Sequence, residues 1–294
     1  MAAAGAVPGI NYNFSMANLE RGHITLGGIR VYRVAGGTGP AVFLLHGMGA
    51  SSYSWRHQVE PLAERFRVFA FDWPGYGRSD QPKGYEYSPD SYVRFLENFM
   101  DAHGVKSASL VGNSMGGLVA LKTALDRPGR VDRLALVGTP VYPGNKPMLL
   151  WPTTWPVIGP VLRELLGLLG PWAVERVARS VFFDKSVVTP EMVEEYSMAL
   201  RTREGRRAIA DFLRSAIPDD VDAYLARYKN MSHPVLVLRG EHDEILDQSS
   251  AERFTGEVPG ARAVYFKDAG HAPHEEIPGP VNEALVGFLA AAAA

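Results

Sequence analysis

The sequence predicts an α/β fold in which helices cover both faces of a mostly parallel sheet. Short apolar runs of strand length recur along the 294 residues, and turn residues bound each of them. Amphipathic segments of helix length separate most of these runs, an alternation that is typical of parallel sheets buried on both sides. The predicted strands are ITL, IRVYRV, AVFLLHG, RVFAFDW, SASLVGNS, RLALVGTP, PVLVLRGEHD and AVYFKDAG.

The segment SPDSYVRFLENFMDAHG predicts a helix with a marked start and end. Ser88 stands at the N-cap position, Pro89 at the first helical position and Gly104 just past the end, which is the order that helix termini favour. A second helix is predicted over MGGLVALKTALDRPG, a segment that runs to Pro128 and Gly129. Both segments follow predicted strands, as the α/β pattern requires.

The alternation stops between residues 141 and 231, where helical patterns such as PEMVEEYSMALRT and REGRRAIADFLRSAI replace strands. Insertions are tolerated at surface connections and often carry binding specificity. We therefore expect a core domain in two parts, residues 1–140 and 232–294, with a helical cap inserted at 141–231.

Composition excludes several classes of function. Lysine and arginine number 30 and aspartate and glutamate 32, so the formal net charge is 30 − 32 = −2. This balance argues against a nucleic-acid partner or an anionic membrane. The chain has 0 cysteines, which removes disulfides, thiol nucleophiles and thiolate metal ligands.

Two segments bear on location. The start, MAAAGAVPGINYNF, lacks the basic region and the long apolar core of a secretory signal, so we expect a cytoplasmic protein. The apolar window at 148–170 carries Pro152, Pro156 and Pro160 and then Arg163 with Glu164. It falls short of the roughly 18 uninterrupted apolar residues that a spanning helix needs. We expect an amphipathic lid and no stable membrane insertion.

The stretch GNSMG, residues 112–116, satisfies G-x-S-x-G between a predicted strand and a predicted helix. This setting predicts a nucleophile elbow, a sharp turn in which flanking glycines let Ser114 project its hydroxyl above the sheet. The alternative is a glycine-rich turn whose serine caps the helix. A serine hydroxyl is a weak nucleophile that needs a base, and a histidine base needs a carboxylate.

Both partners follow later strands. Asp243 comes three residues after Gly240 in RGEHDEI, and His271 directly follows Gly270 in AGHAPHEE. The order serine, aspartate, histidine is that of the α/β-hydrolase arrangement. Ser114, Asp243 and His271 are therefore the predicted catalytic triad.

Neighbouring side chains offer alternatives for the acid, the base and a metal site. We expect solvated or surface positions for Glu241, Glu244, Asp247, His242 and His274. The group His271, His274, Glu275 and Glu276 could suggest a metal, but no further ligand spacing resembles a zinc or di-iron motif. We predict no metal and no cofactor.

The turn HGMG, at residues 46–49, follows another predicted strand. A backbone N–H there can face the carbonyl oxygen of a bound substrate. We assign the two oxyanion donors to the backbone N–H groups of Met48 and Met115. His46 is expected to brace this turn by hydrogen bonds.

Together HGMG, DWPGYGRSD, GNSMGG, GEHDEI and GHAPHEE resemble the α/β-hydrolase superfamily, in its capped branch of small serine hydrolases. The resemblance runs from about Gly22 to Leu289. It implies a largely parallel eight-stranded sheet, an antiparallel strand near its start, and structural roles for Gly75, Gly77 and Ser79. It also implies Ser114 as nucleophile, which disfavours the haloalkane dehalogenase and epoxide hydrolase branches with aspartate at that position.

Another branch, the meta-cleavage-product hydrolases that split carbon–carbon bonds, resembles the chain in GNSMGG and in REGRRAIADFLRS. The chain departs from that branch at Ala272, where those enzymes commonly have tryptophan. It also departs in HGMGASSYSW, which lacks their longer glycine- and proline-rich loop and has Trp55 near the position of their polar asparagine. We therefore predict an esterase acting on a small-molecule ester, with carbon–carbon hydrolysis as the alternative. A ligand-binding protein that keeps the triad is a further, non-enzymatic alternative.

The predicted cap is rich in large apolar side chains, more than a solvated insertion needs. Some of them should line a concave apolar pocket, although each could instead attach the cap to the core. Such a pocket favours esters with apolar or aromatic acyl groups. The predicted pocket residues are Gly47, Trp55, Trp151, Trp155, Phe182 and Phe183, and the other apolar candidates are Leu165, Leu168, Leu169 and Trp172.

Overall fold

A computed structural model describes residues 19–142 and 151–291, so the starting segment used to predict location lies outside it. Its sheet has eight strands in the order β1-β2-β4-β3-β5-β6-β7-β8. β1 pairs antiparallel with β2 and β2 with β4, and the other pairs are parallel. The strands are β1 (Glu20–Leu26), β2 (Ile29–Gly36), β3 (Ala41–Leu45), β4 (Arg67–Phe71), β5 (Ala108–Asn113), β6 (Val131–Val137), β7 (Val235–Gly240) and β8 (Arg262–Phe266). The predicted eight-stranded, mostly parallel sheet is confirmed.

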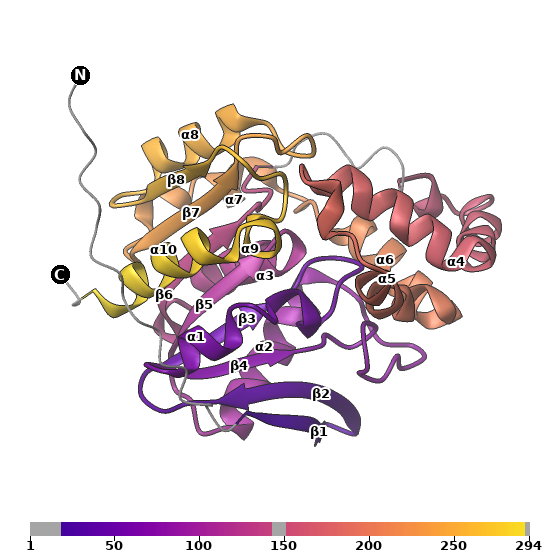
Figure 1. Ribbon diagram of the computed structural model, residues 1–294, viewed down its shortest axis with the longest axis horizontal. Coiled ribbons are helices and arrows are strands. Elements are labelled where there is room, and N and C mark those ends of the chain that lie inside the picture. The colour runs from indigo at the N-terminus through magenta and orange to yellow at the C-terminus, as the bar shows by residue number, and fades with distance from the viewer. Residues whose placement is uncertain (1–18, 143–150, 292–294) are drawn as a thin grey trace.

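Helices cover both faces of this sheet (Figure 1). Side chains of β3 alternate between two apolar cores, Phe43 and Leu45 entering one and Val42 and Leu44 the other, as the two-residue period of a strand requires. Residues of α2, α3 and α8 join the first core, and residues of α1 and α10 join the second. These helices are α1 (Val59–Ala63), α2 (Pro89–Ala102), α3 (Met115–Asp126), α8 (Gln248–Glu257) and α10 (Pro278–Ala290).

The predicted termini of α2 are confirmed. The Ser88 hydroxyl accepts a hydrogen bond from Ser91 N at 3.2 Å, and Pro89 is the first helical residue. Gly104 follows the helix with a φ of +66°, a conformation that glycine adopts without steric cost.

A block of helices separates β6 from β7, and its described residues form no strand. We call residues 151–231 the insertion. Figure 1 shows α4, α5 and α6 grouped beside the sheet rather than on one of its faces. The insertion comprises η3 (Trp151–Thr154), α4 (Gly159–Val181), η4 (Lys185–Val187), α5 (Pro190–Ser197), η5 (Met198–Arg201), α6 (Arg203–Ser215), α7 (Val221–Leu225) and η6 (Tyr228–Asn230). Its standing as a separate cap domain stays a prediction.

The longest helix, α4, is kinked. Gly170 has a φ of +47° and a ψ of −126°, and Pro171 follows it inside the helix. Proline removes a backbone donor and clashes with the preceding turn, so α4 consists of two shorter helices. Within residues 19–142 and 151–291, no helix is long and apolar enough to cross a membrane. The first three residues of the apolar window at 148–170 lie outside the described part.

Candidate active site

Ser114 lies in the sharp turn between β5 and α3. Its φ is +50° and its ψ is −113°, and no other described non-glycine residue has a positive φ. Such strain costs on the order of 1–3 kcal/mol and clusters at functional sites. The Ser114 side chain makes no capping hydrogen bond to α3, so the turn does not serve to cap the helix.

The glycines around Ser114 stand where the backbone has no room for a side chain. A Cβ at Gly112 would lie 2.5 Å from the carbonyl of Gly116, and a Cβ at Gly116 would lie 2.1 Å from Leu45 O. A Cβ at Gly47 would lie 3.4 Å from Ser114 Cβ. These close approaches bring the turn after β3 directly against the turn that carries Ser114.

His271 and Asp243 form a buried, hydrogen-bonded pair on loops that follow two neighbouring strands, β8 and β7. His271 Nδ1 lies 2.9 Å from Asp243 Oδ2, and the two residues are 5% and 7% exposed. An ionised carboxylate only accepts hydrogen bonds, so Nδ1 is the donor. The other ring nitrogen, Nε2, therefore carries no proton in neutral His271 and can act as a base.

The loop after β7 holds Asp243 in its ionised form. Asp243 Oδ1 accepts hydrogen bonds from Ile245 N at 2.9 Å and Leu246 N at 3.0 Å. Burial raises the pKa of Asp243, but the hydrogen bond and charge of His271, with these two backbone donors, bring the pKa below its usual value. A carboxylate that stays ionised can stabilise a charged His271 during a reaction.

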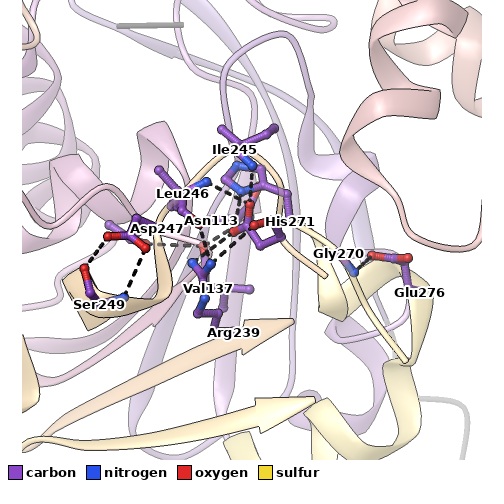
Figure 2. Close-up of polar contacts among 12 residues, drawn as sticks. Asn113, Val137, Arg239, Ile245, Leu246, Asp247, Ser249, Gly270, His271 and Glu276 are labelled. Carbon is purple, nitrogen blue, oxygen red and sulfur yellow. Dashed lines mark hydrogen bonds and ion pairs between the residues drawn. The ribbon is translucent and has the colours of Figure 1, made fainter. Parts of the chain in front are cut away.

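Arg239, which the sequence analysis did not single out, lies beneath this loop (Figure 2). Its side chain is 5% exposed and its Nη1 lies 3.5 Å from Asp243 Oδ2. Arg239 Nη2 donates to the backbone oxygens of Asp243 and Leu246. The sequence did contain a signal for this role, because Arg239 is the one charged residue in the apolar strand VLVLRG. A buried guanidinium needs several acceptors, which the following loop supplies.

The predicted oxyanion donors lie beside the serine. Met48 and Met115 line the same cavity as Ser114 and His271. Neither backbone N–H donates a hydrogen bond to another described residue, so both are free to meet a ligand oxygen. Met115 is also the first residue of α3, where the helix dipole favours negative charge. Their role as donors stays a prediction.

His46 braces the turn after β3, as expected. Its Nδ1 donates to Gly47 O at 2.8 Å, and its Nε2 accepts from Trp73 N at 3.1 Å. Burial lowers the pKa of His46, although the charge of Asp72 opposes this. Both ring nitrogens are occupied, so His46 has a structural part in the site.

A cavity of about 810 Å³ opens between the core loops and the insertion. The core supplies Ser114 and His271 together with apolar side chains, and the insertion supplies mainly apolar side chains together with Arg163 and Arg206. Of the predicted pocket residues, Gly47, Trp151 and Phe182 line it. Among its other lining residues are Leu166, Ala173, Val174, Val177, Ala178, Val181, Leu200, Ile209, Phe212 and Leu213.

Three predicted pocket residues do not line the cavity. Trp55 is fully buried in the core on the α1 and α10 side of the sheet, its ring 4.3 Å from that of His274. Trp155 is 47% exposed at the surface of the insertion. Phe183 is 46% exposed and stacks on His242 with ring centroids 3.8 Å apart. Sequence hydrophobicity could not tell which face each ring would occupy.

The other apolar candidates of α4 also point away from the cavity. After the kink, the face of α4 that lines the cavity has smaller residues such as Ala173 and Val177, and before the kink Arg163 and Leu166 line it. The opposite face leaves large side chains in solvent, at exposures of 48%, 83%, 47% and 63% for Leu165, Leu168, Leu169 and Trp172.

The alternative acids and bases are not paired with His271. Glu241, Glu244, Asp247 and His242 are exposed, as expected. Glu244 nevertheless lines the cavity, and Asp247 caps α8 by accepting a hydrogen bond from Ser249 N. Asp243 is thus the carboxylate that the loop brings to the histidine.

The surface position expected for His274 is wrong. His274 is fully buried in α9 (Pro273–Glu276), against Trp55. Burial holds the pKa of His274 well below its usual value, and the positive charge of Arg56 adds to this. Pro273, two residues after His271, is the first residue of α9, and His274 in this helix packs on the buried Trp55 ring. No group of three potential metal ligands occurs among the described residues.

This fold and these loop positions define an α/β hydrolase. The family model described as "alpha/beta hydrolase fold" matches residues 40–278, and the chain belongs to this family. Membership of this family, together with the hydrolases among its relatives, shows that the protein is a hydrolase.

Curated and solved relatives include different hydrolases. The chain is 29% identical over 259 residues to 2-hydroxymuconate semialdehyde hydrolase of Pseudomonas sp. (strain CF600), covering 84% of this chain and 86% of that protein. The meta-cleavage product hydrolase CumD of Pseudomonas fluorescens IP01 is 26% identical with a TM-score of 0.74, covering 90% of this chain and 96% of that one. Carboxylesterase CesB of Bacillus subtilis has a TM-score of 0.78 at 23% identity, covering 92% of each chain, a likeness of fold.

Proposed function

We propose that the chain is a serine esterase that cleaves small carboxylic esters with apolar acyl groups through an acyl-enzyme on Ser114. One observation carries the proposal. Ser114, in its strained turn, opens into an apolar cavity together with His271, whose Nδ1 is fixed by a buried Asp243. A histidine base that is oriented by a carboxylate activates a serine hydroxyl by taking its proton.

The reaction proceeds in two halves. His271 Nε2 takes the Ser114 proton as Oγ attacks the ester carbonyl, and the Met48 and Met115 N–H groups stabilise the resulting oxyanion. Asp243 stabilises the imidazolium. His271 then protonates the leaving alcohol, and the same steps with water release the acid and restore Ser114.

The cavity determines which acyl groups fit. Its insertion side is formed mainly by aliphatic and aromatic side chains, among them Leu166, Val177 and Phe182. Burying an apolar acyl chain there gains about 0.8 kcal/mol for each methylene removed from water. Medium-length or aromatic acyl groups should therefore be preferred to charged ones.

The test is an ester panel assayed with wild type and Ser114→Ala. We expect wild type to hydrolyse p-nitrophenyl butyrate, octanoate and benzoate faster than a succinate monoester. Ser114→Ala should lose on the order of 10⁴-fold or more in kcat. Equal turnover by the pure variant, or a preference for the charged ester, would overturn the proposal.

Carbon–carbon hydrolysis is the second candidate, because 2-hydroxymuconate semialdehyde hydrolase and CumD resemble the chain over most of its length. A meta-cleavage dienoate included in the same panel separates the two. Turnover of the dienoate with a larger kcat/KM than every ester would select this candidate. Tight binding of a panel compound without turnover of any would select a ligand-binding protein.

A further inference from the structure

A buried carboxylate joins the insertion to the core close to His271. Glu275 lies on α9, and its side chain is 4% exposed. Its Oε2 accepts a hydrogen bond from Arg56 Nη1 at 2.6 Å and another from the Tyr196 hydroxyl at 2.7 Å. We call Arg56, Glu275 and Tyr196 the Glu275 clasp.

The three residues of the clasp come from three separate segments. Arg56 directly follows the short helix η1 (Ser52–Trp55), beyond the turn after β3. Tyr196 belongs to α5 of the insertion, and Glu275 to the helix that follows His271. A single oxygen atom therefore ties the insertion to the loops on both sides of the active site.

Ring contacts hold the clasp in place. Arg56 Cζ lies 4.3 Å from the centroid of the Tyr53 ring. Tyr53 also meets Tyr196 edge to face, with centroids 6.2 Å apart. Such contacts orient the guanidinium and the hydroxyl toward one acceptor, and charge-assisted bonds of this length are stronger than neutral ones.

The clasp lies at the wall of the cavity. Glu275 and Tyr196 both line it, as does Ala272. Tyr196 and Ala272 also belong to a small apolar cluster with Phe182 and Met192, so the tyrosine ring packs where insertion and core meet. A shift of α5 would therefore move the surface against which an acyl group rests.

Packing alone does not require a charge at this place. A buried ion pair is often no more stabilising than apolar side chains of similar volume, and its fixed geometry instead selects one arrangement of the segments it joins. Burial raises the pKa of Glu275, and Arg56 opposes this. The carboxylate thus depends on both partners for its place in the interior.

We propose that Glu275 is a positioning residue, which holds α5 against the His271 loop and thereby sets the affinity of the active site for bulky apolar acyl groups. It acts through Tyr196 and Arg56 and takes no part in proton transfer. The inference rests on the proposed esterase function.

The adjacent Glu276 explains why Glu275 variants should still fold. Glu276 Oε1 accepts a hydrogen bond from Gly270 N at 2.7 Å (Figure 2), and its Oε2 accepts from Phe183 N at 2.7 Å and Asp184 N at 3.0 Å. His271 N also donates to Val181 O at 2.9 Å. These bonds keep the His271 loop in place when the neighbouring side chain is changed.

The experiment compares Glu275→Leu, Glu275→Gln and Tyr196→Phe, with Glu175→Leu as a matched control. Glu175 is a half-exposed glutamate of α4 that pairs with Arg179 in the same helix. In Glu275→Leu, KM for p-nitrophenyl octanoate should rise about tenfold, because binding of the substrate would then have to restore the position of α5. The decrease in kcat on p-nitrophenyl acetate should be several times smaller. Tyr196→Phe should show the same split to a lesser degree.

The glutamine variant provides a rescue. Its amide oxygen still accepts from Arg56 and Tyr196, so KM for the octanoate should return to within about twofold to threefold of wild type. Hydrogen exchange in α5 should rise in Glu275→Leu and stay near wild type in Glu275→Gln and in the Glu175 control. This second measurement does not depend on catalysis.

Three results overturn the inference. One is an unchanged octanoate KM in Glu275→Leu, and another is an equal loss of acetate and octanoate turnover with no rescue by glutamine. The third is unchanged exchange in α5. Absence of ester hydrolysis in wild type would instead refute the proposed function, and the exchange measurement would then still decide whether the clasp holds α5.

Discussion

The core loops and the insertion build two sides of one cavity by different means. Backbone constraints fix the core side, since Ser114 is held at a positive φ and Gly116 leaves no room for a side chain. Side-chain contacts hold the insertion, whose helix α4 is kinked and leaves Leu168 83% exposed. The rigid side carries the predicted chemistry, and the side held by packing shapes the acyl site. Changes to the two sides should therefore have different consequences.

The largest effect is expected on the rigid side, at Asp243. In Asp243→Asn an amide replaces the carboxylate that fixes the His271 tautomer and stabilises the charged imidazolium, so kcat should fall about 10⁴-fold, with KM little changed. Steady-state kinetics on p-nitrophenyl butyrate give the result. Asp247→Asn, on the same loop and exposed, is the control. A loss below tenfold in Asp243→Asn would mean that another carboxylate supports the base.

Adjacent phenylalanines give the next contrast, on the insertion side. Phe182 is 3% exposed and lines the cavity, whereas Phe183 is 46% exposed and does not. Phe182→Ala should lower the free energy of unfolding by about 3 kcal/mol or more and favour longer acyl chains. Phe183→Ala should cost less than about 1 kcal/mol and leave chain-length preference unchanged. Urea denaturation and the octanoate-to-acetate ratio of kcat/KM measure both, and similar results for the two would contradict the assignment.

Gly116→Ala tests the close backbone approach at the elbow. Its Cβ would lie 2.1 Å from Leu45 O, so the free energy of unfolding should fall by about 3 kcal/mol. Gly129→Ala is the control, because its Cβ would meet nothing within 4 Å, and its stability should stay within about 0.5 kcal/mol of wild type. Equal stability of the two variants would show that the turn has room to relax.

The smallest effect concerns acid stability. The folded pKa of Asp243 lies below its usual value of 3.8, so its contribution is present above that value and is lost as pH falls through the lower folded pKa. The free energy of unfolding should therefore fall more steeply with decreasing pH in wild type than in Asp243→Asn. Denaturant titrations from about pH 5 to pH 3 provide the comparison. Parallel pH curves would mean that Asp243 is not held ionised.

The difference between the two sides also explains what the sequence could predict. Glycines, turn residues and strand ends are local signals, so the elbow, the pairing of Asp243 with His271 and the sheet followed from them. Whether Phe182 or Phe183 faces the cavity depends on how the insertion packs, which no local pattern encodes. Glu275 acquires its contacts only when distant segments meet. Arg239 contacts the loop that directly follows its own strand, but no pattern in the strand tells that the guanidinium folds back onto that loop. Trp55 was misplaced because its short helix η1 turns it into the core.

The central claim is that Ser114 is the nucleophile, and covalent labelling tests it most directly. A fluorophosphonate should add one equivalent to wild type, peptide mass spectrometry should place the adduct on Ser114, and Asp243→Asn should label far more slowly. Ser114→Ala should not be labelled. Two results would contradict the account. One is labelling at another residue, and the other is loss of ester hydrolysis on treatment with the fluorophosphonate while Ser114 stays unlabelled.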